Sequence, residues 1–75
     1  MRDTVPNNLD QAILAFGRAW WRYGGGSDED IYVEFGLSAR SYFERLRIVL
    51  DGQAAASLDE QTRAQMHAIC MRRLH

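Results

Sequence analysis

The side chains best placed for chemistry in this chain are two Arg, two Ser and one Glu near its middle. If this stretch is helical, Arg40, Glu44 and Arg47 follow at spacings of four and three residues and therefore share one face. A guanidinium group binds phosphates and guanine edges, and a carboxylate accepts a hydrogen bond from the amino group of cytosine. Ser38 and Ser41, near the start of the same helix, would touch a phosphate backbone. One interpretation of this face is a surface that lies in the major groove of DNA.

The same face has a second interpretation that involves no ligand. The face continues to Asp51, so positive and negative charges alternate along it. Ion pairs one turn apart would then sum to zero charge and only keep the helix soluble. The whole chain has a net charge of −1 and a pI near 6.0, whereas a strongly basic domain would be typical of nucleic-acid binding. All nine basic residues are Arg, which either suits phosphate recognition or reflects a GC-rich genome.

Capping signals and a glycine predict the helices that position this face. Ser27 can cap a helix over 28–35, and the acidic residues that follow it suit the positive end of the helix dipole. Gly36 can take the left-handed conformation that ends such a helix. Ser38 then caps a second helix over 39–51. The expected result is two helices joined by a tight turn.

This pair of helices resembles the helix-turn-helix of DNA-binding proteins. The shared positions are an apolar anchor, a turn glycine, an apolar residue, a capping serine and two anchors in the second helix, here Ile31, Gly36, Leu37, Ser38, Tyr42 and Leu46. The pattern departs at Tyr32, because a small residue is usual where the two helices approach each other. The resemblance implies a DNA-binding fold in which the second helix enters the major groove.

Two more helices are expected, one on each side of this pair. Residues 9–23 carry large apolar side chains at spacings of three and four, which is typical of an amphipathic helix. These side chains are Leu9, Ile13, Phe16, Trp20 and Tyr23. Three consecutive glycines then form a flexible connector to the next helix. After a capping box at Ser57 and Glu60, a helix over 58–73 has a thin apolar face, so we expect it to dock loosely or to wait for a partner.

These elements predict an all-α fold, a small three-to-four-helix bundle that contains the helix-turn-helix. The chain has 75 residues, and a domain of this size buries only about 60% of its unfolded surface. We expect residues 1–7 to be a flexible N-terminal arm, 8–52 to be the helix-turn-helix three-helix core, and 53–75 to be a linker and C-terminal helix. The expected core residues are Ile13, Phe16, Trp20, Ile31, Phe35, Tyr42 and Leu46.

Other side chains are candidates for contacts with partners. Four arginines would contact phosphates outside the groove: Arg18, Arg22, Arg72 and Arg73. Three large apolar side chains would form a patch for docking a protein: Trp21, Phe43 and Leu50. Trp21 also shares a second apolar stripe with Leu14, which we expect to meet either the last helix of the same chain or a second copy in a homodimer. Paired half-sites on DNA favour the homodimer.

The rest of the composition narrows the function classes. Cys70 is the only cysteine, which excludes an intrachain disulfide and a CxxC metal pair and suits a reducing cytoplasm. No apolar stretch is long enough to span a membrane, so no membrane partner is expected. The Ser, His and acidic residues do not form a catalytic pattern, so we expect neither an enzyme nor a bound metal or cofactor.

A further resemblance covers residues 13–51. ILAFGRAWWRYGG followed by FGLSARSYFERLRIVLD is similar to a family of short actinobacterial proteins of unknown function that also occur in their phages. The shared positions are Ile13, Leu14, Phe16, Trp20, Trp21, Phe35, Gly36, Ser38, Tyr42, Phe43 and Leu46. This resemblance implies a helix-turn-helix fold and a regulatory role. Two functions remain open: a small transcriptional regulator that binds double-stranded DNA, and a non-catalytic module that binds RNA polymerase or another regulatory protein.

Overall fold

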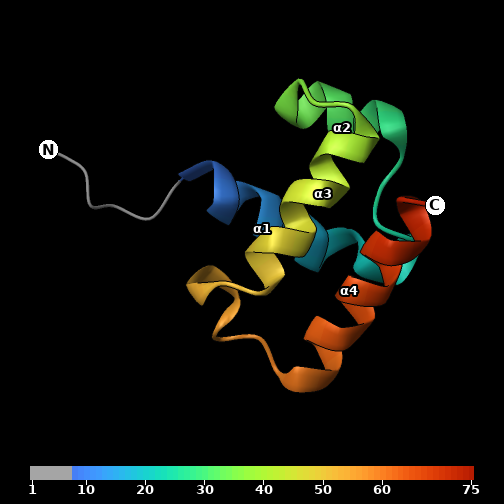
Figure 1. Cartoon of the computed structure of the whole chain (residues 1–75). Coiled ribbons are helices and arrows are strands. Elements are labelled where there is room, and N and C mark those ends of the chain that lie inside the picture. Colours follow the sequence, from blue (N-terminus) through green and yellow to red (C-terminus); the bar gives the residue numbers. More distant parts are fainter. Residues whose placement is uncertain (1–7) are drawn as a thin grey trace, which may run out of the picture.

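The computed structural model describes residues 8–75, which form four α-helices and two short 3-10 turns (Figure 1). The helices are α1 (Asn8–Trp20), α2 (Asp28–Phe35), α3 (Ala39–Leu50) and α4 (Glu60–Arg73), and the turns are η1 (Trp21–Tyr23) and η2 (Gln53–Ala55). Residues 8–75 contain no strand, and the predicted all-α fold is confirmed. The predicted arm at 1–7 lies outside the described residues.

Most helix boundaries agree with the local signals in the sequence. The Oγ of Ser27 accepts a hydrogen bond from the backbone N–H of Asp30 at 3.1 Å. The Oγ of Ser38 accepts one from the backbone N–H of Ser41, also at 3.1 Å. Gly36 ends α2 with a φ of 69°, the left-handed conformation that glycine adopts without strain. The first helix differs in its last turn, which tightens into η1 instead of continuing as an α-helix.

The predicted capping residue of the last helix was wrong. Asp59, and not Ser57, caps α4, because the Asp59 carboxylate accepts a hydrogen bond from the backbone N–H of Thr62 at 3.1 Å. The hydrogen bonds from Thr62 lower the pKa of the Asp59 carboxyl, which keeps it charged beside the positive end of the helix dipole. Ser57 and Asp59 are both residue types that can cap a helix, and α4 begins after Asp59.

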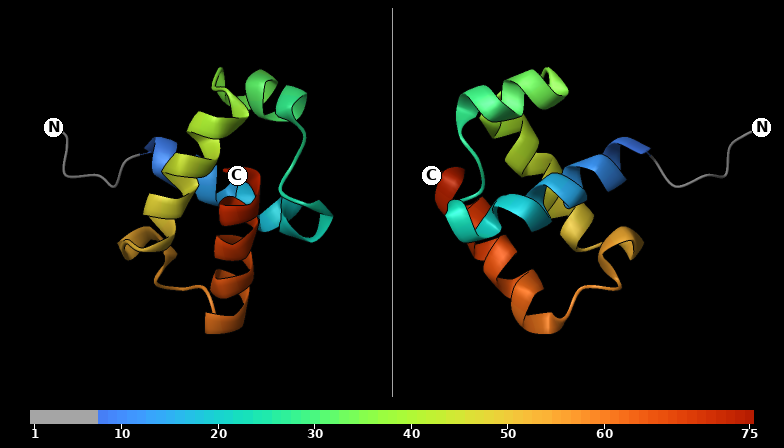
Figure 2. Two further views of the ribbon diagram at one scale, coloured as in Figure 1. Left: turned by 45° about the vertical axis from the view of Figure 1, so that its right-hand side comes forward. Right: turned by 180° about the vertical axis from the view of Figure 1, so that it is seen from behind.

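The central helix of the molecule is α3, which contacts α1, α2, α4 and η2. In Figure 1, α1 crosses behind α3, α2 lies at its upper end and α4 runs beside it. Figure 2 shows the same arrangement after a turn of 45° and from behind. The buried residues of α3 are Tyr42, Phe43, Leu46, Val49 and Leu50. An apolar surface of this width needs cover from several elements, and the surrounding helices supply it.

Tyr42 joins α1, α2 and α3 in the core. Its ring stacks with that of Phe35, with 5.3 Å between centroids, and meets Phe16 edge-on at 5.5 Å. Its hydroxyl donates a hydrogen bond to the backbone carbonyl of Ile13 at 3.0 Å, so the buried polar group is satisfied. Burial raises the pKa of the Tyr42 hydroxyl, which therefore remains a donor. Ile13 and Ile31 are fully buried nearby, as expected.

The expectations for three large apolar residues were wrong. Trp20 is only half-buried and stacks on Phe16 at 5.7 Å, because α1 ends at Trp20 and the chain turns away there. Phe43 and Leu50, expected in a patch that docks a protein, are 0% and 1% exposed. They are covered because α4 and η2 pack against α3. Phe43 and Leu50 therefore belong to the core and cannot form a docking patch.

The C-terminal helix docks firmly on the rest of the domain. Met66, Ile69 and Cys70 of α4 are buried. Trp21 lines the same small internal space as Met66 and Ile69, so the second stripe of the first helix and the apolar face of α4 meet within the chain. The expectation of a loosely docked helix was therefore wrong. The surplus apolar surface that favoured a homodimer is also covered without a second copy.

Substitution of aromatic residues should show which of them are fully buried in the core and which are only half-buried at its edge. Phe43→Ala removes a fully buried ring, so it should lower the free energy of unfolding by about 3–5 kcal/mol. Trp20→Ala removes a half-buried ring and should cost only about 1–2 kcal/mol. Urea unfolding followed by circular dichroism measures both values. A Trp20 variant that lost as much stability as the Phe43 variant would place Trp20 in the core after all.

Candidate nucleic-acid interface

The outer face of α3 carries most of the residues selected above for contact with DNA. Arg40, Ser41, Glu44 and Arg47 are all exposed, because the opposite side of α3 is taken up by the core. Nε of Arg40 lies 3.5 Å from a carboxylate oxygen of Glu44, and both side chains are solvent-accessible. An exposed ion pair of this length contributes little free energy. Arg40 can therefore exchange Glu44 for a ligand at small cost.

Ser38 and Arg45, close to the outer face of α3, form hydrogen bonds within the protein. The Oγ of Ser38 is engaged in capping α3, which leaves its O–H to donate to a ligand. Nε of Arg45 donates a hydrogen bond to the Asp10 carboxylate on α1 at 2.9 Å. This pair spans 35 residues of sequence, so local patterns gave no sign of it. The pair links α3 to α1 at the edge of their packed interface.

Ile48 is a further residue on the outer face that the sequence patterns did not single out. It is 64% exposed and follows Glu44 by one helical turn. An exposed isoleucine among charged side chains is of little use to stability. On a surface that faces the major groove, an apolar side chain can contact the methyl group of thymine. Its position outside the apolar stripe of α3 is the one sequence signal that marks it.

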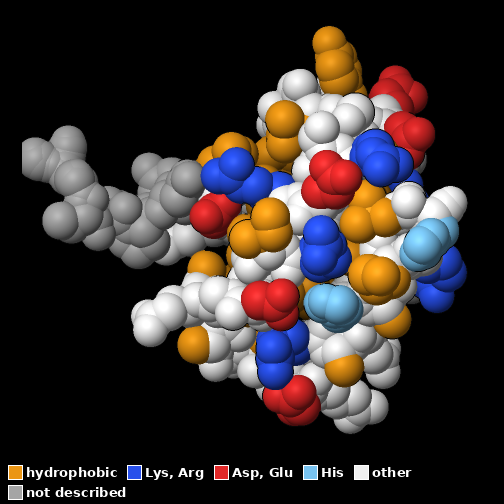
Figure 3. Space-filling view, in the orientation of Figure 1, with side chains coloured by type: hydrophobic (Ala, Val, Ile, Leu, Met, Phe, Trp, Pro, Cys, Tyr) orange, Lys and Arg blue, Asp and Glu red, His pale blue; other side chains and the backbone are white. Residues whose placement is uncertain are grey.

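Charge is mixed on the side of the molecule that presents α3. Figure 3 has the orientation of Figure 1 and shows Arg and acidic side chains interspersed over this face, with apolar side chains between them. Attraction to a polyanion would therefore come from a few individual guanidinium groups rather than from a broad positive field. Arg47 is the exposed arginine of α3 for which the described part of the chain provides no ion pair.

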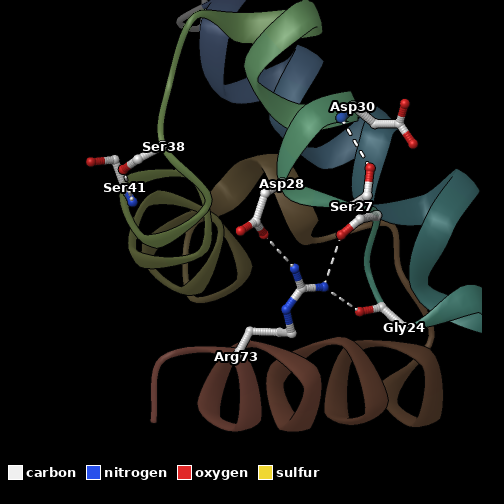
Figure 4. Close-up of polar contacts among 8 residues, drawn as sticks. Gly24, Ser27, Asp28, Asp30, Ser38, Ser41 and Arg73 are labelled. Carbon is white, nitrogen blue, oxygen red and sulfur yellow. Dashed lines mark hydrogen bonds and ion pairs between the residues drawn. The ribbon is translucent and has the colours of Figure 1, made fainter.

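Arg73, one of the four predicted phosphate contacts, is instead a structural residue (Figure 4). Its Nη1 donates hydrogen bonds to the backbone carbonyls of Gly24 and Gly26, both at 2.8 Å. Its Nη2 donates to the Asp28 carboxylate at 3.1 Å. The guanidinium carbon also lies 4.6 Å from the centroid of the Phe43 ring. Through these three hydrogen bonds, Arg73 fastens α4 to the loop that precedes α2.

The glycine run is consequently not the flexible connector that was expected. Gly25 and Gly26 are buried, and φ is 89°, 100° and 98° at the three successive glycines. Phe43 and Ile69 crowd the position where a Cβ on Gly25 would lie, and Phe16 crowds that on Gly26. The loop is held by packing on one side and by Arg73 on the other.

The other three predicted phosphate contacts are exposed. Arg18, Arg22 and Arg72 come from α1, η1 and α4 rather than from α3. The guanidinium carbon of Arg22 lies 5.4 Å from the centroid of the half-buried Trp21 ring. Arg22 and Arg72 border a shallow surface pocket of about 360 Å³ together with Trp21. These arginines can bind anions, but they form a group apart from the residues of α3.

Little else in the described chain indicates covalent or metal chemistry. Cys70 is a free, buried thiol, and burial raises its pKa to about 11, although Arg47 acts against this rise. It is therefore protonated and unreactive near neutral pH. Within residues 8–75, no three His, Cys, Asp or Glu side chains gather where they could hold a metal ion. None of the helices there is long and apolar enough to cross a membrane.

Fold and surface together define a small all-α domain whose central helix exposes Arg, Ser and Glu side chains on its outer face. Residues 7–70 match the family described as "Protein of unknown function (DUF3263)", and the chain belongs to this family. The resemblance to a small family without an assigned activity is thus confirmed. Comparisons with curated proteins and with solved structures gave no match.

Substitution of Arg73 should reveal its structural role. Arg73→Ala removes charge-assisted hydrogen bonds to two carbonyls and the contact with the Phe43 ring, so it should lower the free energy of unfolding by about 2–4 kcal/mol. The neighbouring Arg72 is exposed, and Arg72→Ala should stay within about 0.5 kcal/mol of the wild type. Chemical denaturation of the two variants makes the comparison. Equal stabilities would contradict the structural role of Arg73.

The glycine loop allows a second matched pair. Gly24 and Gly26 both have positive φ, but an added Cβ meets nothing within 4 Å at Gly24 and meets the Phe16 ring at 2.7 Å at Gly26. Gly24→Ala should therefore cost about 1–2 kcal/mol from backbone strain alone. Gly26→Ala should cost about 1–3 kcal/mol more, because the ring must move. Thermal unfolding of both variants measures the difference, and equal losses would mean that the loop is not packed against Phe16.

Proposed function

We propose that this protein is a small DNA-binding domain of the helix-turn-helix kind, with α3 as the helix that enters the major groove. The observation that carries the proposal is the arrangement of α2 and α3. A capped helix, a left-handed glycine and a capping serine join them through three residues, and the outer face of α3 is left open. A role in transcription regulation in the cytoplasm follows from DNA binding and is part of the same proposal.

The outer face of α3 offers contacts of three kinds. Arg47 and Arg40 donate to guanine edges or phosphates, with Arg47 ahead because Arg40 has Glu44 as a partner. Ser41, beside the start of α3, donates to the phosphate backbone. Ile48 contacts a thymine methyl group, and Glu44 accepts from cytosine. Such a surface binds through specific contacts more than through net charge, which suits a chain with a net charge of −1.

The residues proposed to dock a protein in the alternative function are largely inaccessible. Phe43 and Leu50 are buried, and Trp21 is half-buried against α4. A module that binds RNA polymerase or another regulator would have to use a different surface of this domain. A homodimer on paired half-sites remains compatible with DNA binding, but its interface would have to lie outside the stripes that meet within the chain.

Titration with double-stranded DNA at two salt concentrations tests the proposal. Affinity should fall as salt rises, because phosphate contacts release counterions. Arg47→Ala should weaken binding by about 1–3 kcal/mol at a preferred sequence, while melting stays nearly unchanged. Arg63→Ala on α4 is the matched control, because Arg63 is a surface arginine paired with Glu60 and lies outside the outer face of α3. It should leave the affinity for DNA unchanged.

The Glu44→Ala variant distinguishes a DNA-binding face on α3 from a face that is only solvated. If α3 faces DNA, removal of this carboxylate ends a repulsion from phosphates, so non-specific affinity should rise. If the outer face of α3 is only a solvated ladder of charges, the substitution should alter neither binding nor stability measurably. Absence of DNA retention at low salt, or equal retention by the wild type and by an Arg40→Ala/Arg47→Ala double variant, would refute the proposal.

A further inference from the structure

An open groove of about 510 Å³ lies between α1 and α2, away from the outer face of α3. The right-hand view of Figure 2 shows these two helices from behind, α1 in blue and α2 in green. Neither the DNA proposal nor the core explains the residues that line it. Its volume lies in the range of binding pockets in proteins, and its open shape suits an elongated occupant rather than a small molecule.

The α1 side of the groove is apolar and consists of alanine and aromatic side chains. Ala12, Ala15 and Ala19 are exposed along one face of α1, where small side chains let another backbone approach closely. Phe16 and Trp20 are half-buried and form the floor beside them. Trp20 stacks on Phe16 without entering the core, so a large aromatic surface remains partly accessible at this place.

The α2 side of the groove is acidic around one apolar residue. Val33 is 77% exposed, and Glu29, Asp30 and Glu34 line the groove with it. Glu29 and Asp30 suit the first turn of α2, where the helix dipole favours carboxylates. Glu34 lies near the opposite end of α2, where the dipole disfavours a negative charge. Within residues 8–75, none of the three carboxylates forms an ion pair, so all three are available to a cationic ligand.

We propose that this groove binds a basic amphipathic helix from a partner protein. The apolar face of such a helix would lie on the alanine surface of α1 and on Trp20, and Arg or Lys side chains at its edge would meet Glu29 and Glu34. The same carboxylates repel phosphates, so the groove is unfavourable for DNA. The inference is independent of the DNA proposal, since it uses other helix faces and other residues.

The test uses a synthetic amphipathic peptide with Leu and Ala along one face and Arg on both flanks. Titrated into ¹⁵N-labelled protein, it should shift the amide signals of Ala15, Ala19 and Val33 and the indole signal of Trp20. The Trp21 indole signal, next to α4, should move much less. A peptide with Glu in place of each Arg should bind at least about tenfold more weakly, because charge complementarity is reversed.

Variants of the protein locate the binding surface. The Glu29→Gln/Glu34→Gln variant should weaken the Arg peptide about fivefold to tenfold, and Glu60→Gln on α4 is the matched control that should leave binding unchanged. Ala19→Gln places a longer side chain at an exposed groove position, so it should weaken binding without loss of folding. Shifts that map to α3 or α4, equal affinity for the two peptides, or no binding at low salt would each overturn the proposal.

Discussion

The burial of two neighbouring aromatic residues on one helix governs the architecture of this domain. Successive side chains on an α-helix point about 100° apart, so Tyr42 and Phe43 require cover from different directions. The rings of Phe16 and Phe35, from α1 and α2, cover Tyr42. Phe43 is covered by α4 and the glycine loop. Because both rings are fully buried, α3 has to lie at the centre, and the other helices are arranged around it.

Features that depend on neighbouring residues were predictable from the sequence, and those that depend on distant contacts were not. Ser27, Gly36 and Ser38 act within one helical turn, and their roles as caps or helix ends were correctly predicted. The role of Arg73 depends on carbonyl groups 47 and 49 residues away, which no local pattern can reveal. Arg73 and the two glycines lie too far apart in the sequence for a helical or strand spacing to relate them.

The prediction that Phe43 is exposed was also wrong because its cover comes from residues distant in the sequence. Its position at the edge of the apolar stripe of α3 suggested that it is exposed. In the structure, the apolar face of α4 is assisted by Arg73, whose guanidinium group lies over the ring. A cationic side chain can contribute to the cover of an aromatic core residue, and a count of apolar residues overlooks it. The exposure of the candidate DNA-contacting residues on α3 was predictable, but the contact between Arg45 of α3 and Asp10 of α1 was not.

The contact between Arg73 and the glycine loop also bears on the order in which the domain forms during synthesis. Helices α1, α2 and α3 precede α4 in the chain, so they are synthesised, with their local capping signals, before its last turn. The loop before α2 acquires its fastening only when Arg73 emerges, 49 residues after Gly24. Until that moment, the glycine loop and the Phe43 ring lack their contacts with the Arg73 guanidinium group. The contacts that fasten the glycine loop and place a guanidinium group over Phe43 are therefore among the last that synthesis makes available.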